Sequence, residues 1–198
     1  MKLTGLVETQ LVDRFGVPFG EPNVELMHTY VANFINMLYG QMAQVSQWTP
    51  VGARLQNTGS TVTTLTRTAN FLRIDAAVGD ANKGLVVGTG TGATTISSYS
   101  LGTKIVHGTG AGQLNYQAVV YEAPEVGATE TKVKIKRVFD NASSDGSRTI
   151  NEIGLYTAEP ALGPQQIFMI IRDVLSTPFV IPLGASGQIT YHLRVVYG

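Results

Sequence analysis

The last third of the chain constrains the fold more than any other part. Three strand-like segments, 148–156, 167–174 and 188–197, are separated by turn-forming residues. The third alternates apolar and polar residues, and the second is apolar on both faces, as in a central strand covered on both sides. Short segments of this kind, recurring from residue 71 onward at about ten-residue spacing, predict an antiparallel β-sandwich.

Composition favours an assembling protein. Charged residues make up 14% of the 198 residues, the formal net charge is zero, and the chain contains 22 glycines. An ordinary soluble domain has roughly 25% charged residues. A surface with few charges and no net charge tends to associate, so we expect self-assembly or binding to protein partners. The alternative is that uncharged polar residues keep the surface hydrated.

Several classes of protein are disfavoured by the sequence. The N-terminus lacks the apolar core of a signal peptide, and no segment approaches the roughly 18 apolar residues of a membrane span. Basic residues are scattered, so no nucleic-acid footprint is expected. The chain has no cysteine, which excludes disulfides and thiolate metal sites.

We interpret the chain as one domain, 1–198, with four regions. Residues 1–22 form an N-terminal β-hairpin or arm, in which Pro18 and Pro22 limit the returning segment to an edge or irregular strand. Apolar residues at helical spacing predict an amphipathic helix over 23–46, with Asn23 as its N-cap. The fold class is therefore mainly β with one N-terminal helix.

The other two regions are a long loop over 47–70 and the sandwich strands over 71–198. Long ordered loops in compact domains are uncommon and often form interfaces. The single tryptophan, Trp48, lies in this loop, where it either anchors an interface or caps the end of the helix's apolar stripe.

No motif indicates an enzyme, a cofactor or a metal. The glycines at 88, 90 and 92 follow an apolar strand, but their spacing and the following residues do not match a dinucleotide-binding loop. The three histidines, His28, His107 and His192, are isolated from one another in sequence. The polar cluster 140–147 is interpreted as a hairpin turn rather than a calcium loop.

Charged residues inside apolar strands are the strongest structural or interface candidates. Glu152 and Arg172 each lie in a segment expected to be buried, where a charge requires a partner. We therefore predict a cross-strand Glu152–Arg172 pair, with an outward contact from Arg172 to a neighbouring subunit as the alternative. Asp173 is expected to accept from backbone or a neighbouring subunit. Gly154 is expected to mark a bulge or a close approach of another backbone.

Three of these segments resemble a group of tailed-bacteriophage virion proteins. The residues concerned are Asn-Glu-Ile-Gly-Leu-Tyr at 151–156, Arg-Asp-Val at 172–174 and the alternating strand at 191–195. The opening strand, Asp-x-x-Gly turn and return also resemble that group, as do Gly-Thr-Gly at 88–90 and the residues around 99–116. The motifs that carry the resemblance are structural rather than catalytic.

The resemblance implies a non-enzymatic virion component of the tail, neck or capsid surface, assembled in the host cytoplasm. Its partners would be other virion proteins and copies of itself. The alternative is a receptor- or glycan-binding fibre module, in which a host-surface receptor would meet exposed aromatic residues. The candidates for that role are Trp48, Tyr99, Tyr116 and Tyr121. A third class, a depolymerase-like enzyme, would require a pair of carboxylates in a groove.

Overall fold

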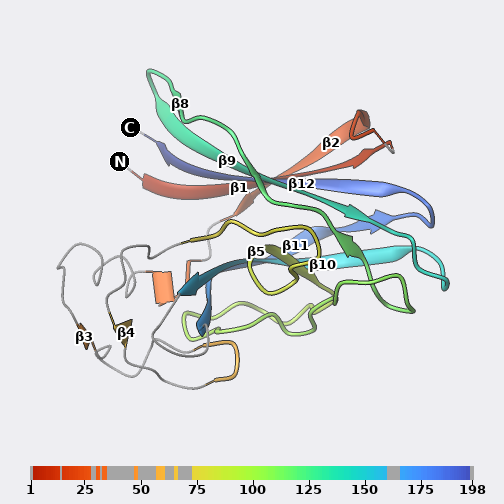
Figure 1. The fold of residues 1–198 in the computed structure, drawn as a ribbon. Coiled ribbons are helices and arrows are strands. Elements are labelled where there is room, and N and C mark those ends of the chain that lie inside the picture. Colours follow the sequence, from red (N-terminus) through yellow and green to blue (C-terminus); the bar gives the residue numbers. More distant parts are fainter. Residues whose placement is uncertain are drawn as a thin grey trace.

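The chain folds mainly into antiparallel β-strands arranged in two layers (Figure 1). The computed structural model describes residues 2–13, 15–27, 30–31, 33–34, 47–48, 57–60, 65–66, 73–159 and 166–196. Residues at the two ends of the chain lie side by side, because β1 (Lys2–Val12) pairs with β12 (Ser186–Val196) from Lys2↔Val196 onward.

The upper layer of Figure 1 has the strand order β2-β1-β12-β9-β6. Its first strand is β2 (Pro18–Met27), and β9 (Glu130–Asp140) lies on the far side of β12. Three short strands continue the sheet beyond β9: β6 (Asn115–Tyr116), β7 (Val120–Tyr121) and β8 (Glu125–Val126). Every pairing in this sheet is antiparallel.

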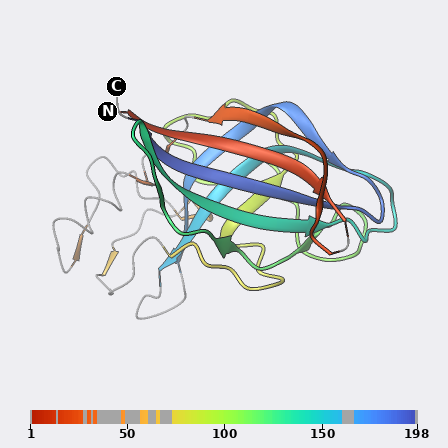
Figure 2. The same cartoon turned by 90° about the horizontal axis from the view of Figure 1, so that it is seen from above.

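The lower layer has the order β11-β10-β5, with β10 (Arg148–Glu159) between β11 (Gln166–Ile181) and β5 (Gly84–Gly88). Seen from above, its strands cross beneath those of the upper layer (Figure 2). Apolar side chains from both layers form one buried cluster, which includes Val7, Ile135, Ile189, Ile153 and Leu155. The core thus lies between the sheets, where the apolar positions of each alternating strand turn inward.

The outer face of the lower sheet is also covered. The segment after β5 folds across it, so Leu101 is buried and its amide bonds to the Tyr156 hydroxyl at 2.7 Å. This second covering explains why 167–174 is apolar on both faces, as the sequence predicts. Its central position was wrong: β11 lies at the edge of its sheet, and β10 is the central strand.

The predicted helix is wrong over its first turn. Residues 23–27 belong to β2, and Asn23 pairs with Thr9 of β1 rather than capping a helix. Hairpin pairing across the Asp13–Val17 turn overrides the helical spacing, and Leu26 is 62% exposed instead of facing a core. Tyr30 forms a bridge with Ile171, only 33–34 among the described residues are helical, and 35–46 lie outside them.

Most of the long loop predicted over 47–70 also lies outside the described residues. Within it, β3 (Gln47–Trp48) pairs with β4 (Leu65–Thr66), so part of this region is a two-stranded sheet. The turn predicted over 140–147 joins β9 to β10, as expected, but it is not a hairpin, because β9 belongs to the upper sheet and β10 to the lower one.

Candidate functional site

The structure contains the Glu152–Arg172 pair that the sequence predicts. Arg172 donates to Glu152 Oε2 from Nε at 2.9 Å and from a terminal nitrogen at 2.7 Å. Glu152 is fully buried and Arg172 is 5% exposed. The two residues are diagonal neighbours, because Gly154 pairs with Arg172 and Glu152 pairs with Val174. The outward contact from Arg172 to another subunit is therefore wrong.

The loops on either side of the pair supply backbone donors to the same carboxylate. The amides of Gly90, Gly102 and Thr103 bond to Glu152 at 3.0, 3.0 and 2.9 Å. Burial raises the pKa of the Glu152 carboxyl, but the Thr103 and Gly102 amides and Arg172 outweigh it and hold the pKa below its ordinary value. Glu152 is thus an ionised anchor for the loops that cover the lower sheet.

The glycine-rich segment 88–92 has a structural role in this anchor. A Cβ on Gly88 would meet Glu152 Oε1 and the Thr103 carbonyl, each at 2.5 Å, and a Cβ on Gly90 would also clash with Glu152. Only glycine allows the backbone to approach the carboxylate this closely. Like a dinucleotide-binding loop, this glycine-rich segment brings its backbone close to an anion, but here the anion is the carboxylate of the chain's own Glu152.

Gly154 and Asp173 are also internal. A Cβ on Gly154 would lie 2.5 Å from the Tyr156 ring, so the close approach is by a side chain and not by the predicted backbone. The register of β10 shifts on both sides of Gly154, although Gly154 itself pairs regularly with Arg172. Asp173 faces the core and accepts from Tyr191 of the upper sheet at 2.6 Å. This side-chain donor differs from the predicted backbone or neighbouring subunit. Burial and Asp173 together raise the pKa of Tyr191 well above its ordinary value.

A buried arginine that the sequence analysis missed connects the two layers. Arg137 of β9 is 1% exposed and donates to five carbonyls, those of Gln117, Lys83, Leu85, Ala77 and Asp80. Its guanidinium also lies 4.8 Å from the centre of the Tyr116 ring. Burial lowers the pKa of Arg137 to about 10. The available signal was its parity, which it shares with apolar Ile135 and Phe139.

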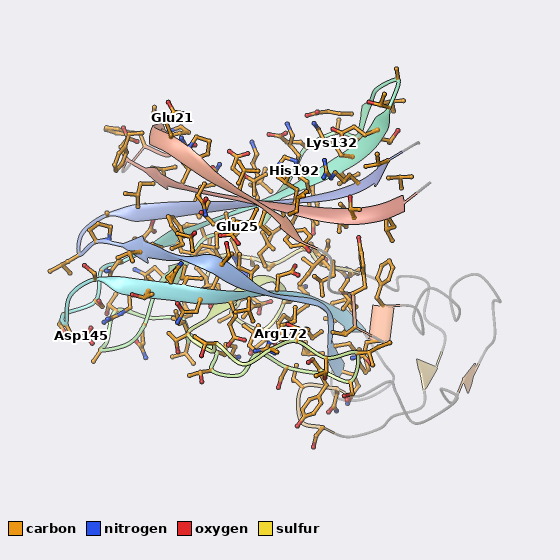
Figure 3. All side chains as sticks on the ribbon, turned by 180° about the vertical axis from the view of Figure 1, so that it is seen from behind. Glu21, Glu25, Lys132, Asp145, Arg172 and His192 are labelled. Atoms are coloured by element: carbon orange, nitrogen blue, oxygen red, sulfur yellow. The ribbon has the colours of Figure 1, made fainter. Side chains whose placement is uncertain are left out.

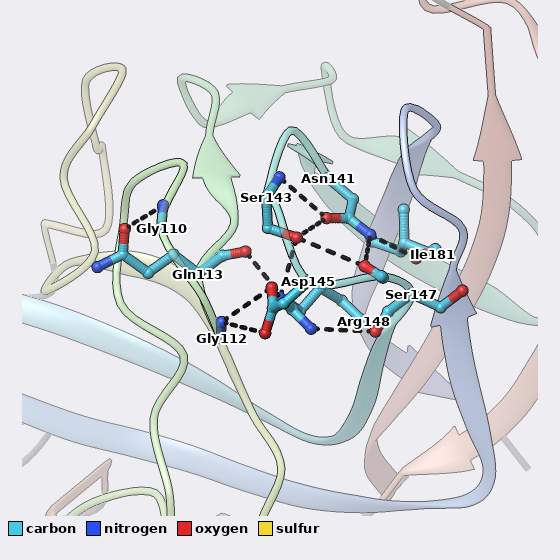
Figure 4. A network of polar contacts seen from close by, with 10 residues as sticks. Gly110, Gly112, Gln113, Asn141, Ser143, Asp145, Ser147, Arg148 and Ile181 are labelled. Carbon is cyan, nitrogen blue, oxygen red and sulfur yellow. Dashed lines mark hydrogen bonds and ion pairs between the residues drawn. The ribbon is translucent and has the colours of Figure 1, made fainter.

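A further polar network fixes the turn between β9 and β10 (Figure 4). The Asn141 side chain donates to the Gly146 and Ile181 carbonyls, both at 2.9 Å, and the Ser143 hydroxyl donates to Asn141 Oδ1 at 2.6 Å. Arg148 pairs with Asp145. These polar groups satisfy one another, so the cluster is a turn support and not an open binding site.

The outer face of the upper sheet carries a ladder of opposite charges. Lys132, Lys134 and Lys136 of β9 pair with Glu122 and Glu125 beside them. Figure 3 shows Lys132 and His192 together on this side of the molecule. Burial lowers the pKa of His192, which favours the neutral imidazole.

The remaining candidates for a metal or ligand site are side-chain clusters and cavities among the described residues. Among them no group of three or more His, Cys, Asp or Glu residues is placed to hold a metal. A cavity of about 210 Å³ near Leu101 and Tyr156 is lined by one amine, Lys104, and by no carboxylate. Lys104 donates to Asn82 at 2.6 Å, and burial lowers its pKa.

The predicted aromatic candidates do not gather on one described surface. Tyr116 is fully buried and donates to the Ile105 carbonyl at 2.6 Å. Tyr121 of β7 is 43% exposed, and Tyr99 is half-buried in the segment covering the lower sheet. The side chain of Trp48 lies outside the described residues, so its two predicted roles stay predictions.

The edges of the two sheets differ in how far other segments of the chain cover them. At β5, residues 103–105 supply backbone bonds to Thr89 and Val87. At β9, the short strands β6, β7 and β8 pair along the edge. At β11, Tyr30 and Val31 bridge to residues 170–171. These three edges are thus at least partly covered by the chain itself, which protects against unwanted strand pairing.

The edge of β2 is different. Within the described part of the chain, β2 pairs only with β1, so the backbone groups along its other side have no strand partner. Its side chains Phe19, Val24 and Leu26 are 49%, 51% and 62% exposed. At the adjoining turn, Phe15 is 76% exposed. We call this strand, with its unpaired side, the β2 edge.

A groove lies beside the β2 edge. It has a volume of about 460 Å³ and separates Phe19 and Glu21 from Pro178 and Phe179 of β11. At its inner end Glu25 closes the gap by accepting from the Ser176 and Thr177 amides at 2.8 and 3.0 Å. In Figure 3, Glu25 lies between the layers and Glu21 lies farther out along β2.

Comparison with known proteins does not assign this surface. No protein-family model, curated protein or solved structure matches the chain. None of the helices in the described residues has the length and hydropathy of a membrane-spanning helix.

Proposed function

We propose that this chain is a non-enzymatic structural component of a tailed-phage virion, a β-sandwich that assembles through protein–protein contacts. The β2 edge is the single observation that carries the proposal. Soluble proteins usually protect long apolar edge strands with charges, bulges or covering segments. Here the described chain covers parts of the other sheet edges, while β2, which has two prolines and a register shift in its first half, keeps an unpaired side and exposed apolar side chains.

The internal use of the candidate site residues supports the same proposal. Glu152, Arg172 and Asp173 are buried. Arg172 bonds to Glu152, and Asp173 accepts from Tyr191. These side chains therefore stabilise the fold and do not face a substrate. The segments that contain them are those that resemble phage virion proteins. A resemblance carried by structural residues is consistent with a role in building a particle.

The position within the particle follows from copy number. Mass spectrometry of particles purified from the encoding phage is expected to detect the chain at a fixed ratio to the major capsid protein. Hundreds of copies would indicate the capsid surface, and six or twelve would indicate the neck or tail, as closed symmetric rings require. Absence of the chain from purified particles would refute the proposal.

A complementation experiment tests the surface itself. Phage lacking the gene are supplied with the wild-type chain, with Val24→Lys, or with Val126→Lys as the control. Val126 is 81% exposed but lies on β8, away from the β2 edge. We expect Val24→Lys alone to reduce incorporation into particles. Equal incorporation of all three chains would refute β2 as the assembly surface.

A further inference from the structure

We infer that the β2 edge binds the same edge of a second copy of this chain, as an antiparallel pair with Val24 on the two-fold axis. This inference rests on the proposed function, because it takes the β2 edge as an assembly surface and names its occupant. The pair would join two upper sheets into one continuous sheet.

The availability of matching edges favours a second copy. An incoming strand must have a free side of its own. The described edges of β5 and β9 are paired with other segments of the chain. The edge of β11 is bridged by residues 30–31, and its amides bond to Glu25. In a solution of this chain, the long edge open to β2 is therefore β2 of another copy. Such a contact uses the same patch on both subunits and closes after two.

The charges on β2 fit this pairing. The strand contains Glu21 and Glu25 but no lysine or arginine, so it lacks the lysines that commonly protect edges. Its prolines and its register shift lie before Asn23, so they leave residues 23–27 open. Glu25 is already engaged with the Ser176 and Thr177 amides of β11, and those bonds lower its pKa despite burial, which raises it. The carboxylate that would most disturb the pair is thus held by its own subunit.

Symmetry limits the possible registers. Residues directly opposite in an antiparallel pair lie on the same face of the sheet, whereas neighbours in one strand lie on opposite faces. A two-fold axis must therefore pass beside a single residue. An axis at Glu25 would oppose the two Glu25 carboxylates, and an axis at Asn23 would oppose Glu21 and Glu25. Like charges directly opposite are destabilising.

The register centred on Val24 avoids both conflicts. It places Leu26 opposite Pro22, giving an apolar row with the two Val24 side chains, and Glu25 opposite Asn23. A centre at Pro22 would place Val24 opposite Gly20, whose φ of +76° departs from extended backbone. A centre at Leu26 would leave only residues 25–27 of β2 in the pair. Val24 is the centre that these constraints leave.

The absence of cysteine gives a direct test of this register. Opposite Cα atoms in an antiparallel pair are about 4.5–5.5 Å apart, within the range of a disulfide. Val24→Cys is therefore expected to form a covalent dimer on mild oxidation, seen on a non-reducing gel. Val126→Cys, the more exposed control on β8, is expected to cross-link far more slowly.

Sedimentation equilibrium of the purified chain supplies the second measurement. A pair of single strands buries less than the roughly 1,600 Å² of a standard interface, so we expect a dissociation constant in the micromolar range. Val24→Lys should weaken the dimer about tenfold or more, equivalent to about 1.4 kcal/mol, and Val126→Lys should leave it unchanged. Melting temperatures establish that each variant folds.

Three results would overturn the inference: a wild-type chain that stays monomeric into the hundreds of micromolar, a dimer insensitive to Val24→Lys, or equal cross-linking of the two cysteine variants. Because cysteine is close to valine in size, the cross-linking test holds even where lysine perturbs folding. If the wild type is monomeric while Val24→Lys still blocks incorporation into particles, the second copy is refuted and the proposed function stands.

Discussion

Replacing Arg172 with alanine is expected to destabilise the fold, because it leaves the buried Glu152 carboxylate without its cation. Breaking a buried pair by removing one partner typically costs about 3–5 kcal/mol. The Glu152 carboxylate would keep its bonds from the Gly90, Gly102 and Thr103 amides. We therefore expect the lower end, about 3 kcal/mol, which is a large share of the roughly 5–15 kcal/mol that holds a domain together.

The reverse change should cost more. Among the described residues, Glu152→Ala would leave the buried Arg172 with the Ala93 carbonyl at 3.3 Å as its one acceptor, and would leave three amides without theirs. Each unsatisfied buried donor adds about 1–3 kcal/mol, so we expect at least 5 kcal/mol. The larger loss expected for Glu152→Ala than for Arg172→Ala comes from the three backbone amides that bond to Glu152, because both variants break the same ion pair.

Urea unfolding of the two single variants and of Arg172→Met with Glu152→Gln measures these terms. In the double variant no uncompensated charge remains, so its loss should be about 2 kcal/mol or more below the sum of the single losses. A loss under about 1 kcal/mol for Arg172→Ala, the level of an exposed pair, would refute the burial argument. So would equal losses for Arg172→Ala and Glu152→Ala.

The lowered pKa of Glu152 adds a pH dependence with a defined sign. A carboxyl whose folded pKa lies below its unfolded value contributes stability above the unfolded value, roughly pH 4.3, and that stability is lost as pH falls through the folded pKa. The stability difference between wild type and Arg172→Ala should therefore be constant near neutral pH and shrink in acid. Urea melts at several pH values would contradict this if the gap widened in acid.

Three further changes test the rest of the interior. Gly154→Val should lower stability by about 1–3 kcal/mol through overpacking against Tyr156, and a wild-type melting temperature would contradict the close approach. Arg137→Met should cost at least 3 kcal/mol, because five carbonyls lose their donor; hydrogen exchange should show lost protection over 77–85, and unchanged protection there would count against it. Tyr191→Phe should cost about 1–3 kcal/mol by removing one donor to the buried Asp173 carboxylate, with calorimetry as the check.

The sequence alone determined the β-strands of the last third and the buried Glu152–Arg172 pair. Strand periodicity is local, so alternation and apolar runs locate β10, β11 and β12 without knowledge of their neighbours. A charge inside an apolar strand needs a partner wherever the strand lies, which predicts Glu152 with Arg172 from burial alone. Gly154 was identified for a similar reason, since a glycine within an apolar strand has a packing cause.

Only the tertiary structure decided that residues 23–27 form a strand and that Arg137 connects the two layers. The spacing of apolar residues over 23–27 favours a helix, whereas pairing with β1 requires a strand. The strand forms because residues 23–27 pair with residues 5–9, and these contacts are not visible in the local spacing. Arg137 is stabilised by carbonyls from loops remote in sequence, and no spacing rule places them around it. The open β2 edge is likewise a property of strand order, because a strand lies at an edge when other strands pair with only one of its sides.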